Sequence, residues 1–347
     1  MNNNNISSTR LSRSYLFSKY KSSYYESGKD LSIHTFILTG LFYLCHFFNG
    51  YVIKTMFAVL ISLMLNRTFI VFHDCVHNSY TPSILLNYII SHITGIIVVT
   101  SPNWYLDHNT HHKTNVNIEN LENYFFNETV TLTKKQYLQL TTKYQQLHYF
   151  YRHPIVFFTL IPQLYFVIFQ RFIYAYKKIK RPYKYNKSLY NVLLDHIINN
   201  VGIFYLWYFL YKIDLLNEYL ISLYINGSIS FMIFHNQHSY NPAFIENNKE
   251  WTQYNSGIKG SAFTLIPRYL KYFYMGIEYH HIHHMNAKIP GYNLQNFHEE
   301  VVEKSGEFNN INKISIRDFI SNLNLTLYDE DNNKYITFEE LNKEKSN

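Results

Sequence analysis

Histidines in three tight clusters are the residues of this sequence whose type and spacing could do chemistry. Within each cluster, histidines stand three or four residues apart, which places their side chains on one face of a helix. Neutral imidazole is a good ligand for iron, zinc, copper and nickel, so the pattern predicts a metal site without naming the metal. If His281 of the third cluster is left out, the candidate ligands are His73, His77, His108, His111, His112, His280, His283 and His284.

The number of these histidines narrows the kind of site. A structural zinc ion takes four ligands and a catalytic zinc usually takes three from the protein, so eight are too many for one ion. Di-iron carboxylate bundles use glutamates with paired Glu-x-x-His motifs, and no such paired pattern occurs in this sequence. The sequence therefore predicts two metal ions of higher coordination number, held almost wholly by histidine.

The composition indicates that membrane helices position these clusters. Only 16% of the 347 residues are charged and 47% are hydrophobic, whereas about a quarter of the residues of a soluble domain are charged. Short polar turns join four apolar stretches into two pairs, so both ends of each pair lie on one side of the membrane. Each stretch comes close to the roughly 20 residues that a spanning helix needs. They cover residues 31–48, 51–72, 194–211 and 215–234.

We therefore expect an all-α membrane protein with four transmembrane helices in two hairpins, interfacial helices, and a cytosolic cap that carries the histidines. Two further apolar stretches, residues 84–99 and 155–169, are assigned to interfacial or re-entrant pieces. If residues 155–169 crossed the bilayer, the third histidine cluster would lie opposite the first two. The basic segment 171–187 would also be moved across the membrane, against the positive-inside rule.

The flanking segments are polar. Residues 1–30 predict a partly disordered cytosolic arm and residues 301–347 a cytosolic tail, around a membrane domain at residues 31–300. The net charge of +7 suits an anionic membrane face, and no nucleic-acid-binding motif occurs in the sequence. Two cysteines build no disulfide framework, which favours a reducing intracellular setting.

The three clusters, their order and their placement resemble the histidine boxes of the integral-membrane fatty acid desaturases, which bind a di-iron centre. The similarity covers roughly residues 35–300, and its details resemble the acyl-lipid branch that acts at the delta-12, or omega-6, position. Gln-His at 237–238, Gly-Ile-Glu-Tyr at 276–279 and Ile-Pro-Gly-Tyr-Asn-Leu at 289–294 carry these details. One departure is Val76, where the first box often has glycine or alanine. Val76 is a spacer, so the predicted ligands stay intact.

The resemblance implies that all eight box histidines are iron ligands and that His238 is a ninth. His235, three residues away, is the rival for this place, and the Gln-His pattern favours His238. Asp74 and Asp107 are candidate hydrogen-bond acceptors that would orient the ligand rings. We expect structural or interfacial roles for the histidines that stand alone, which are His34, His46, His92, His148, His153, His196 and His298.

The resemblance also implies the reaction. A desaturase of this family uses O2 and two electrons to introduce a cis double bond into a fatty acyl chain, here one that a membrane lipid carries. Because no haem-binding His-Pro-Gly-Gly motif occurs in the sequence, we expect an external electron donor of the cytochrome b5 or ferredoxin type. The expected location is an intracellular membrane, the endoplasmic reticulum in a eukaryotic cell, with the active site facing the cytosol.

Two alternatives stay open at this point. The boxes do not distinguish a desaturase from a related membrane oxygenase that acts as a hydroxylase, ketolase or acetylenase. A histidine-rich metal-binding membrane protein or transporter is a different class, and it predicts ligands inside the spans that face a pathway. The three clusters lie outside the expected spans, which favours the enzyme.

Overall fold

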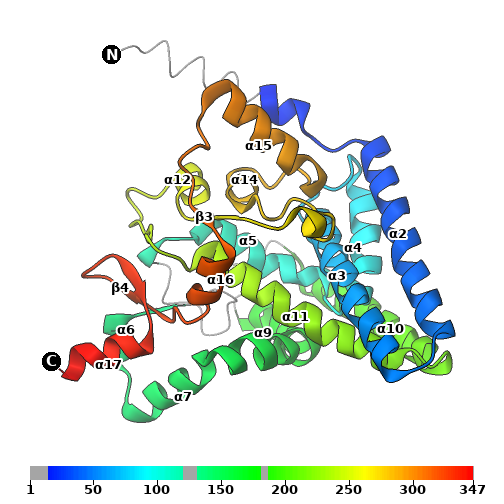
Figure 1. The fold of residues 1–347 in the computed structure, drawn as a ribbon, viewed down its shortest axis with the longest axis horizontal. Helices are drawn as coiled ribbons and strands as arrows, with labels where there is room; N and C mark the ends of the chain where they lie inside the picture. Colours follow the sequence, from blue (N-terminus) through cyan, green and yellow to red (C-terminus); the bar gives the residue numbers. More distant parts are fainter. Residues whose placement is uncertain (1–14, 120–130, 181–186, 347) are drawn as a thin grey trace.

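Helices make up most of the part of the chain that the computed structural model describes, which is residues 15–119, 131–180 and 187–346 (Figure 1). Four long helices form two hairpins in the molecule. They are α2 (Tyr24–Phe47), α3 (Tyr51–Val76), α10 (Leu189–Lys212) and α11 (Leu216–His238). Gly50 and Asp214 lie in the two turns and both have a positive φ. The four predicted apolar stretches therefore pair in the expected order.

A core cluster between the hairpins holds α3 in place. Ile61 and Leu65 of α3 are fully buried and pack in one cluster with Leu210 of α10 and Tyr219 of α11. Burying a large apolar side chain stabilises the fold by about 1.5–3 kcal/mol. The packing fixes the position of the carboxyl-terminal end of α3, which carries the first histidine cluster.

The chain before α3 is more ordered than predicted. The Ser23 hydroxyl accepts a hydrogen bond from the backbone N–H of Glu26 and caps α2, so this helix begins well before residue 31. Residues 15–19 are also helical, and Leu16 is buried in a cluster with Phe297. The prediction of a partly disordered arm is therefore wrong for residues 15–30, and residues 1–14 lie outside the described part of the chain.

The chain after α11, residues 239–346, folds into a cap that carries the third histidine cluster. β2 (Phe263–Thr264) pairs in parallel with β3 (Lys313–Ile314). β4 (Leu327–Asp329) is the middle strand of a second sheet, parallel to β1 (Leu132–Thr133) and antiparallel to β5 (Lys334–Ile336). The elements of the cap are α12 (Gln253–Ile258), β2 (Phe263–Thr264), η5 (Arg268–Leu270), α13 (Lys271–Tyr274), α14 (His280–Met285), α15 (Gly291–Ser305), β3 (Lys313–Ile314), α16 (Ile316–Asn322), β4 (Leu327–Asp329), β5 (Lys334–Ile336) and α17 (Phe338–Ser346).

The predicted tail, residues 301–347, is a folded part of this cap wherever the structure describes it. Leu327, Ile336 and Leu341 are buried against Tyr137 of α6 (Lys134–Gln139), which precedes α7 (Thr142–Arg152). These apolar side chains lie between polar ones, so the segment reads as polar on average although one face of it is buried. The segment is therefore folded where the structure describes it, and its assignment as a separate cytosolic tail stays a prediction.

The segment at residues 84–99 ends in a sharp bend. It forms α4 (Ile84–Ile97), and after a turn at Val99, which has a positive φ, the chain continues as η1 (Pro102–Trp104) and α5 (Tyr105–Thr114). The two helical parts are bent by 105°. A broken span and the predicted re-entrant piece share this shape, and the bend brings the second histidine cluster to the cap.

Residues 155–169 belong to one helical run, which is made of η3 (Val156–Leu160), α8 (Ile161–Gln163), η4 (Leu164–Phe169) and α9 (Gln170–Lys180). η3 and η4 are π-helical, and their wide turns accommodate Pro162, which has no N–H to donate. Lys177 of this run pairs with Asp107, and Arg152, just before it, donates to the Leu325 carbonyl in the cap. The run thus contacts α5 through Lys177, and the chain just before it contacts the cap through Arg152.

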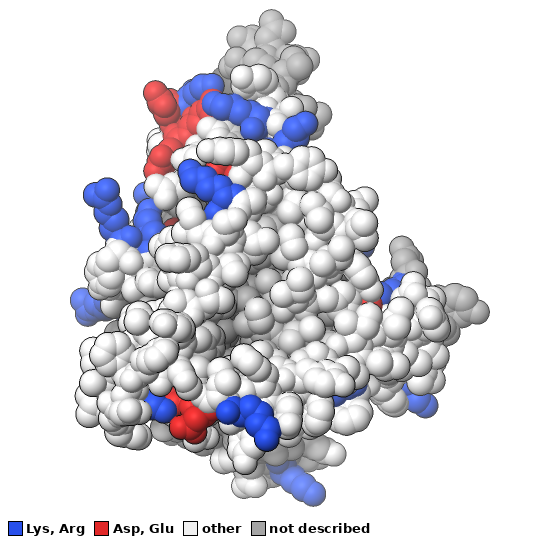
Figure 2. Space-filling view, turned by 90° about the vertical axis from the view of Figure 1, so that its right-hand side faces the viewer, with Lys and Arg blue, Asp and Glu red and all other residues white. Residues whose placement is uncertain are grey.

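The surface of the hairpins suits a hydrocarbon environment over a broad belt. Figure 2 shows a broad central area of this face without charged residues, with charged residues above it, below it and at its edges. Phe36, Met56 and Phe204 are among the large apolar side chains exposed on the hairpins. Lys54 pairs with Glu218 near the turns, at the end opposite the cap. Exposed apolar area of this extent marks a membrane or protein contact.

Within the described residues, length and apolarity identify two to three candidate spans. Two are Tyr51–Val76 and Val156–Ile173, and the bent pair Ile84–Ile97 and Pro102–Thr114 is a third if it counts as one span. The other hairpin helices are long enough but carry more polar residues. The topology with four spans and a cytosolic cap therefore stays a prediction, as does the interfacial placement of residues 155–169.

Candidate metal centre

The predicted ligands lie on four helices, α3, α5, α11 and α14, whose ribbons are drawn in Figure 1. The carboxyl-terminal end of α3 carries the first cluster, and α5 carries the second. α14 carries the third cluster, and the last residue of α11 is His238. All nine predicted ligand histidines are buried. None of the described helices could build the site alone, because each presents at most three of these rings.

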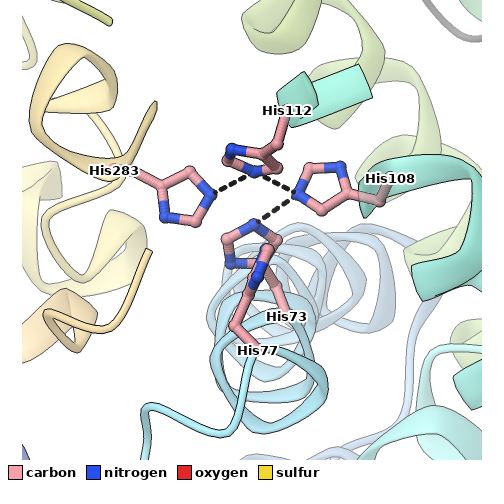
Figure 3. A group of neighbouring side chains, drawn as sticks. All are labelled: His73, His77, His108, His112 and His283. Atoms are coloured by element: carbon pink, nitrogen blue, oxygen red, sulfur yellow. Dashed lines mark hydrogen bonds between the residues drawn. The ribbon is translucent and has the colours of Figure 1, made fainter. Parts of the chain in front are cut away.

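The nine rings divide into two groups. In each group, one ring nitrogen from every member lies within 4.8 Å of the corresponding atoms of the others. The first group is His73, His77, His108, His112 and His283, as shown in Figure 3. The second group is His111, His238, His280 and His284.

Helical spacing explains this division. The pairs four residues apart stay together, because they lie on one helix face. His108 and His112 of α5 belong to the first group, and His280 and His284 of α14 belong to the second. The remaining member of each helix, His111 and His283, points to the other group. α5 thus contributes two rings to the first group and one to the second, and α14 contributes one to the first and two to the second.

The spacing within the first group fits an ion between the rings. His108 Nε2 lies 3.0 Å from His73 Nε2 and 3.1 Å from His112 Nε2, and His283 Nε2 lies 2.9 Å from His112 Nε2. Two nitrogens that bind one ion at about 2.1 Å lie about 3.0 Å apart at a right angle, and about 3.4 Å apart at the tetrahedral angle. Four of the five rings have this spacing, and His77 lies within 4.8 Å of them, so the group offers up to five nitrogen ligands.

The second group has the same spacing. His111 Nε2 lies 3.2 Å from both His238 Nε2 and His284 Nε2, and His280 Nε2 lies 2.9 Å from His238 Nε2 and 3.1 Å from His284 Nε2. These distances again fit right-angled ligands. Four rings leave room in such a sphere for further ligands that are not histidine.

The rings of α14 are prepared for a metal by their environment. Burial holds the pKa of His280, His283 and His284 well below the ordinary value for histidine, and neighbouring histidines lower it further. These rings are therefore neutral at pH 7, the form that binds metal. Facing nitrogen lone pairs repel one another unless a proton or cation lies between them. The donor set and its spacing thus fit two metal ions.

Two hydrogen bonds orient rings in the groups. His238 Nδ1 donates to the Gly260 carbonyl, which leaves its Nε2 lone pair facing the second group. Asp74 Oδ1 lies 3.2 Å from His73 Nδ1, while Asp74 Oδ2 accepts from the Gly291 N–H at 2.6 Å. Asp74 therefore has the position predicted for an orienting acceptor.

Other polar candidates lie elsewhere. Asp107 is buried and its carboxylate pairs with Lys177 at 2.6 Å, so its predicted contact with a ligand ring stays a prediction. His235 Nε2 lies 2.9 Å from the Asn322 carbonyl, and the ring is outside both groups. His281 Nε2 lies 3.2 Å from His298 Nδ1, in the cap. The structure therefore places His238, and not His235, among the clustered rings.

An apolar cavity of about 620 Å³, part of it open space, borders both groups. His73 and His108 of the first group and His280 of the second line it. Most of its wall is apolar and includes Phe69, Ile70, Trp104, Phe166, Phe231, Ile233, Phe234 and Ile277. The Trp104 ring stacks on the His108 ring with 4.2 Å between centroids. Sequence reasoning missed these residues, because aromatic residues are too common in this chain for their positions to signal a role.

Comparison with known proteins supplies the family. The model of the family described as fatty acid desaturase matches residues 50–311, more than half of the chain. The chain belongs to the fatty acid desaturase family. As a family member it is an oxidoreductase of membrane lipid metabolism, and its two buried histidine groups are candidate metal sites.

Named relatives of this desaturase differ in the position at which they act. A fatty acid desaturase of Bacillus subtilis (strain 168) is 28% identical over 310 residues, covering 88% of this chain and 84% of that protein. An sn-1 acyl-lipid omega-3 desaturase (ferredoxin) of Nostoc sp. (strain 36) is 24% identical over 281 residues, which cover 78% of this chain and 74% of that protein. A chloroplastic omega-6 fatty acid desaturase of Spinacia oleracea is 30% identical over 119 residues, which cover 34% of this chain and 26% of that protein.

Proposed function

We propose that this desaturase holds two iron ions and uses O2 and two electrons to introduce a cis double bond into the acyl chain of a membrane lipid. The observation that carries this proposal is the apolar cavity that borders both histidine groups. A hydrocarbon chain in that cavity would lie against both metal positions at once.

The nine clustered histidines would hold the iron, five in the first group and four in the second. Bound iron, together with O2, would supply the oxidising power that an unactivated CH2–CH2 pair requires, which acid and base side chains cannot provide. In the overall reaction the acyl chain loses two hydrogen atoms, while O2 takes up these, two electrons and two protons and becomes water.

The chain itself would position the substrate and exclude water. Phe69, Phe231 and Phe234 give the cavity apolar walls, which favour an acyl chain over solvent. The Trp104 ring beside His108 covers one flank of the first group. These contacts would fix which C–C bond lies next to the metal.

The position of the new double bond is the finer part of the proposal. The sequence details at residues 237–238, 276–279 and 289–294 favour the delta-12, or omega-6, position, while the similar proteins include both omega-3 and omega-6 desaturases. Electrons would come from a separate cytochrome b5 or ferredoxin type of donor, and the printed name of the Nostoc relative includes ferredoxin. The proposed location is an intracellular membrane, with the histidines on the cytosolic side.

Fatty acid profiling of yeast that expresses the chain tests the proposal. We expect a new unsaturated fatty acid with the wild-type chain, and none with His283→Ala at an equal amount of membrane-inserted protein. A hydroxylated, oxidised or acetylenic product would favour the related oxygenases. No new product, with metal bound, would favour a metal-binding membrane protein.

A further inference from the structure

A second cavity adjoins the one at the metal groups. It spans about 400 Å³ when open solvent at its mouth is included, and it shares Phe69, Phe166 and Ser230 with the first cavity. Its remaining lining residues are Val98, Val99, Thr100, Gln163, Val167, Leu223, Asn226 and Gly227. None of these lining residues is charged. The shared residues make the two cavities neighbours along α11, from Gln237 at the metal end to Leu223.

One side of this cavity is buried and the other side reaches the surface of the protein. Val99, Thr100 and Asn226 are buried and form its inner wall. Gln163, Leu223 and Gly227 are partly exposed, and Val167 is 38% exposed. The opening therefore lies between α11 and the run formed by α8 and η4.

The surface around this opening is apolar. Ile168 and Phe169 of η4 are exposed on one side, and Leu220 and Ile221 of α11 are exposed on the other. Exposed apolar side chains of this kind suit lipid tails better than water. Its position next to the metal cavity, its uncharged lining and its apolar edges together indicate a hydrocarbon occupant.

Gly227 keeps this opening free. A Cβ atom at position 227 would lie 2.9 Å from the Gln163 side-chain nitrogen, so this flexible end of the side chain would have to shift. The Gln163 amide lies across α11 and donates to the Tyr224 carbonyl at 3.0 Å. A larger residue at 227 would fill the opening or displace Gln163 within it.

Aromatic rings separate the two cavities. The Phe166 ring lies 6.0 Å from the Phe69 ring and 6.1 Å from the Phe231 ring, centroid to centroid. Phe166 belongs to the π-helical η4, and π-helical turns occur frequently at functional sites. Rotation of one partly exposed ring would join the cavities without moving a helix.

We propose that the second cavity is a lateral port, through which the acyl chain of a membrane lipid passes from the bilayer to the metal centre between α11 and η4. This inference rests on the proposed function and adds the route of the substrate. A blind pocket that holds only the methyl end of the acyl chain is the competing role for the same space.

Closing the port tests the inference. In yeast, Gly227→Leu is expected to lower the conversion of 16- and 18-carbon chains alike, by about tenfold, because the added side chain and the displaced Gln163 amide would occupy the opening. Iron content per chain should stay at the wild-type value. Gly40→Leu is the matched control, because Gly40 is a helical glycine with nothing near its Cβ position, and its activity should be unchanged.

Two results would overturn the inference. A shift of preference toward shorter chains in Gly227→Leu would assign the space to the methyl end of the substrate. Unchanged conversion in both Gly227→Leu and Val167→Phe, which narrows the opening from the other side, would mean that the acyl chain does not use it. If the wild-type chain forms no unsaturated product, the proposed function fails and the port is judged by labelling alone.

Photo-crosslinking provides that second readout. Phosphatidylcholine with a diazirine in its acyl chain, in vesicles that contain the purified protein, should label Gln163, Val167 or Leu223. Gly227→Leu should reduce this labelling by about tenfold, because the same side chains would occupy the opening, and Gly40→Leu should not reduce it. Labelling that is absent from these residues in the wild-type protein contradicts the port.

Discussion

His238, the last residue of α11, faces His280, the first residue of α14, with 2.9 Å between their Nε2 atoms. This contact ties the second hairpin to the cap through the second group of rings. The Gly260 carbonyl accepts from the opposite nitrogen of His238 and fixes the direction of its ring. α11 thus contributes one ring to a group that otherwise comes from α5 and α14.

Removal of this ring should therefore remove iron. We expect His238→Ala to lose about one iron per chain, since three imidazoles would remain in its group, and to form no double bond. His235→Ala is the matched control, because that ring is also buried but lies against the Asn322 carbonyl. Metal analysis of both purified variants is the measurement. The reverse pattern, or normal iron in both, contradicts the assignment.

The spacing of the histidines made the site predictable, but not all of its arrangement. Pairs four residues apart, such as His108 and His112, share a helix face, so their common group could have been derived from the sequence. Which group His111 and His283 join depends on the angle at which α5 and α14 cross, and a single sequence does not specify that angle. The choice of His238 over His235 came from the family pattern and agrees with the placement of the rings.

Other parts of the structure have no pattern in the sequence from which they could be predicted. Pro162 predicts a break in a helix, and only the backbone reveals that π-helical turns absorb it. The fold of the carboxyl-terminal segment was not predicted, because its apolar residues, including Leu327 and Leu341, are few and scattered among polar ones. The port at Gly227 depends on the distance between two helices that are far apart in the sequence.

The carboxylate beside His73 should tune metal affinity. Asp74→Ala removes the acceptor that holds the His73 ring and the bond to the Gly291 N–H. We expect iron to bind about 10–100-fold more weakly, the usual effect of losing such a partner. Competition with a chelator measures this affinity. Unchanged affinity would show that Asp74 does not orient the ring, and Asp107→Ala compares the other predicted acceptor, which pairs with Lys177.

The cap should lose stability as the pH is lowered, because of His298. Burial, followed by the nearby Lys313, lowers the pKa of His298 to about 4, whereas an unfolded histidine titrates near 6.5. The unfolded chain therefore takes up the proton first, and stability that is present above pH 6.5 is lost as the pH falls toward 4. His298→Phe should weaken this decline in Tm between pH 6.5 and 5. An equally steep decline in the variant would exclude His298 as a cause.

Labelling of single cysteines should test the membrane topology. Lys180 is exposed at the end of α9, and Asn49 is exposed in the turn of the first hairpin. We expect Lys180→Cys to react with a membrane-impermeant maleimide from the cytosolic side and Asn49→Cys from the opposite side. Cys45 and Cys75 are both buried and give little background. Labelling of both positions from the same side would overturn the predicted placement.

The metal content of the purified protein tests the central claim most directly. Two groups of buried histidine nitrogens, spaced for right-angled ligands, should hold one iron each. Elemental analysis of protein from iron-supplied cells is therefore expected to give about two irons per chain, and less iron in His111→Ala and His283→Ala. One zinc ion per chain and no iron would contradict the account.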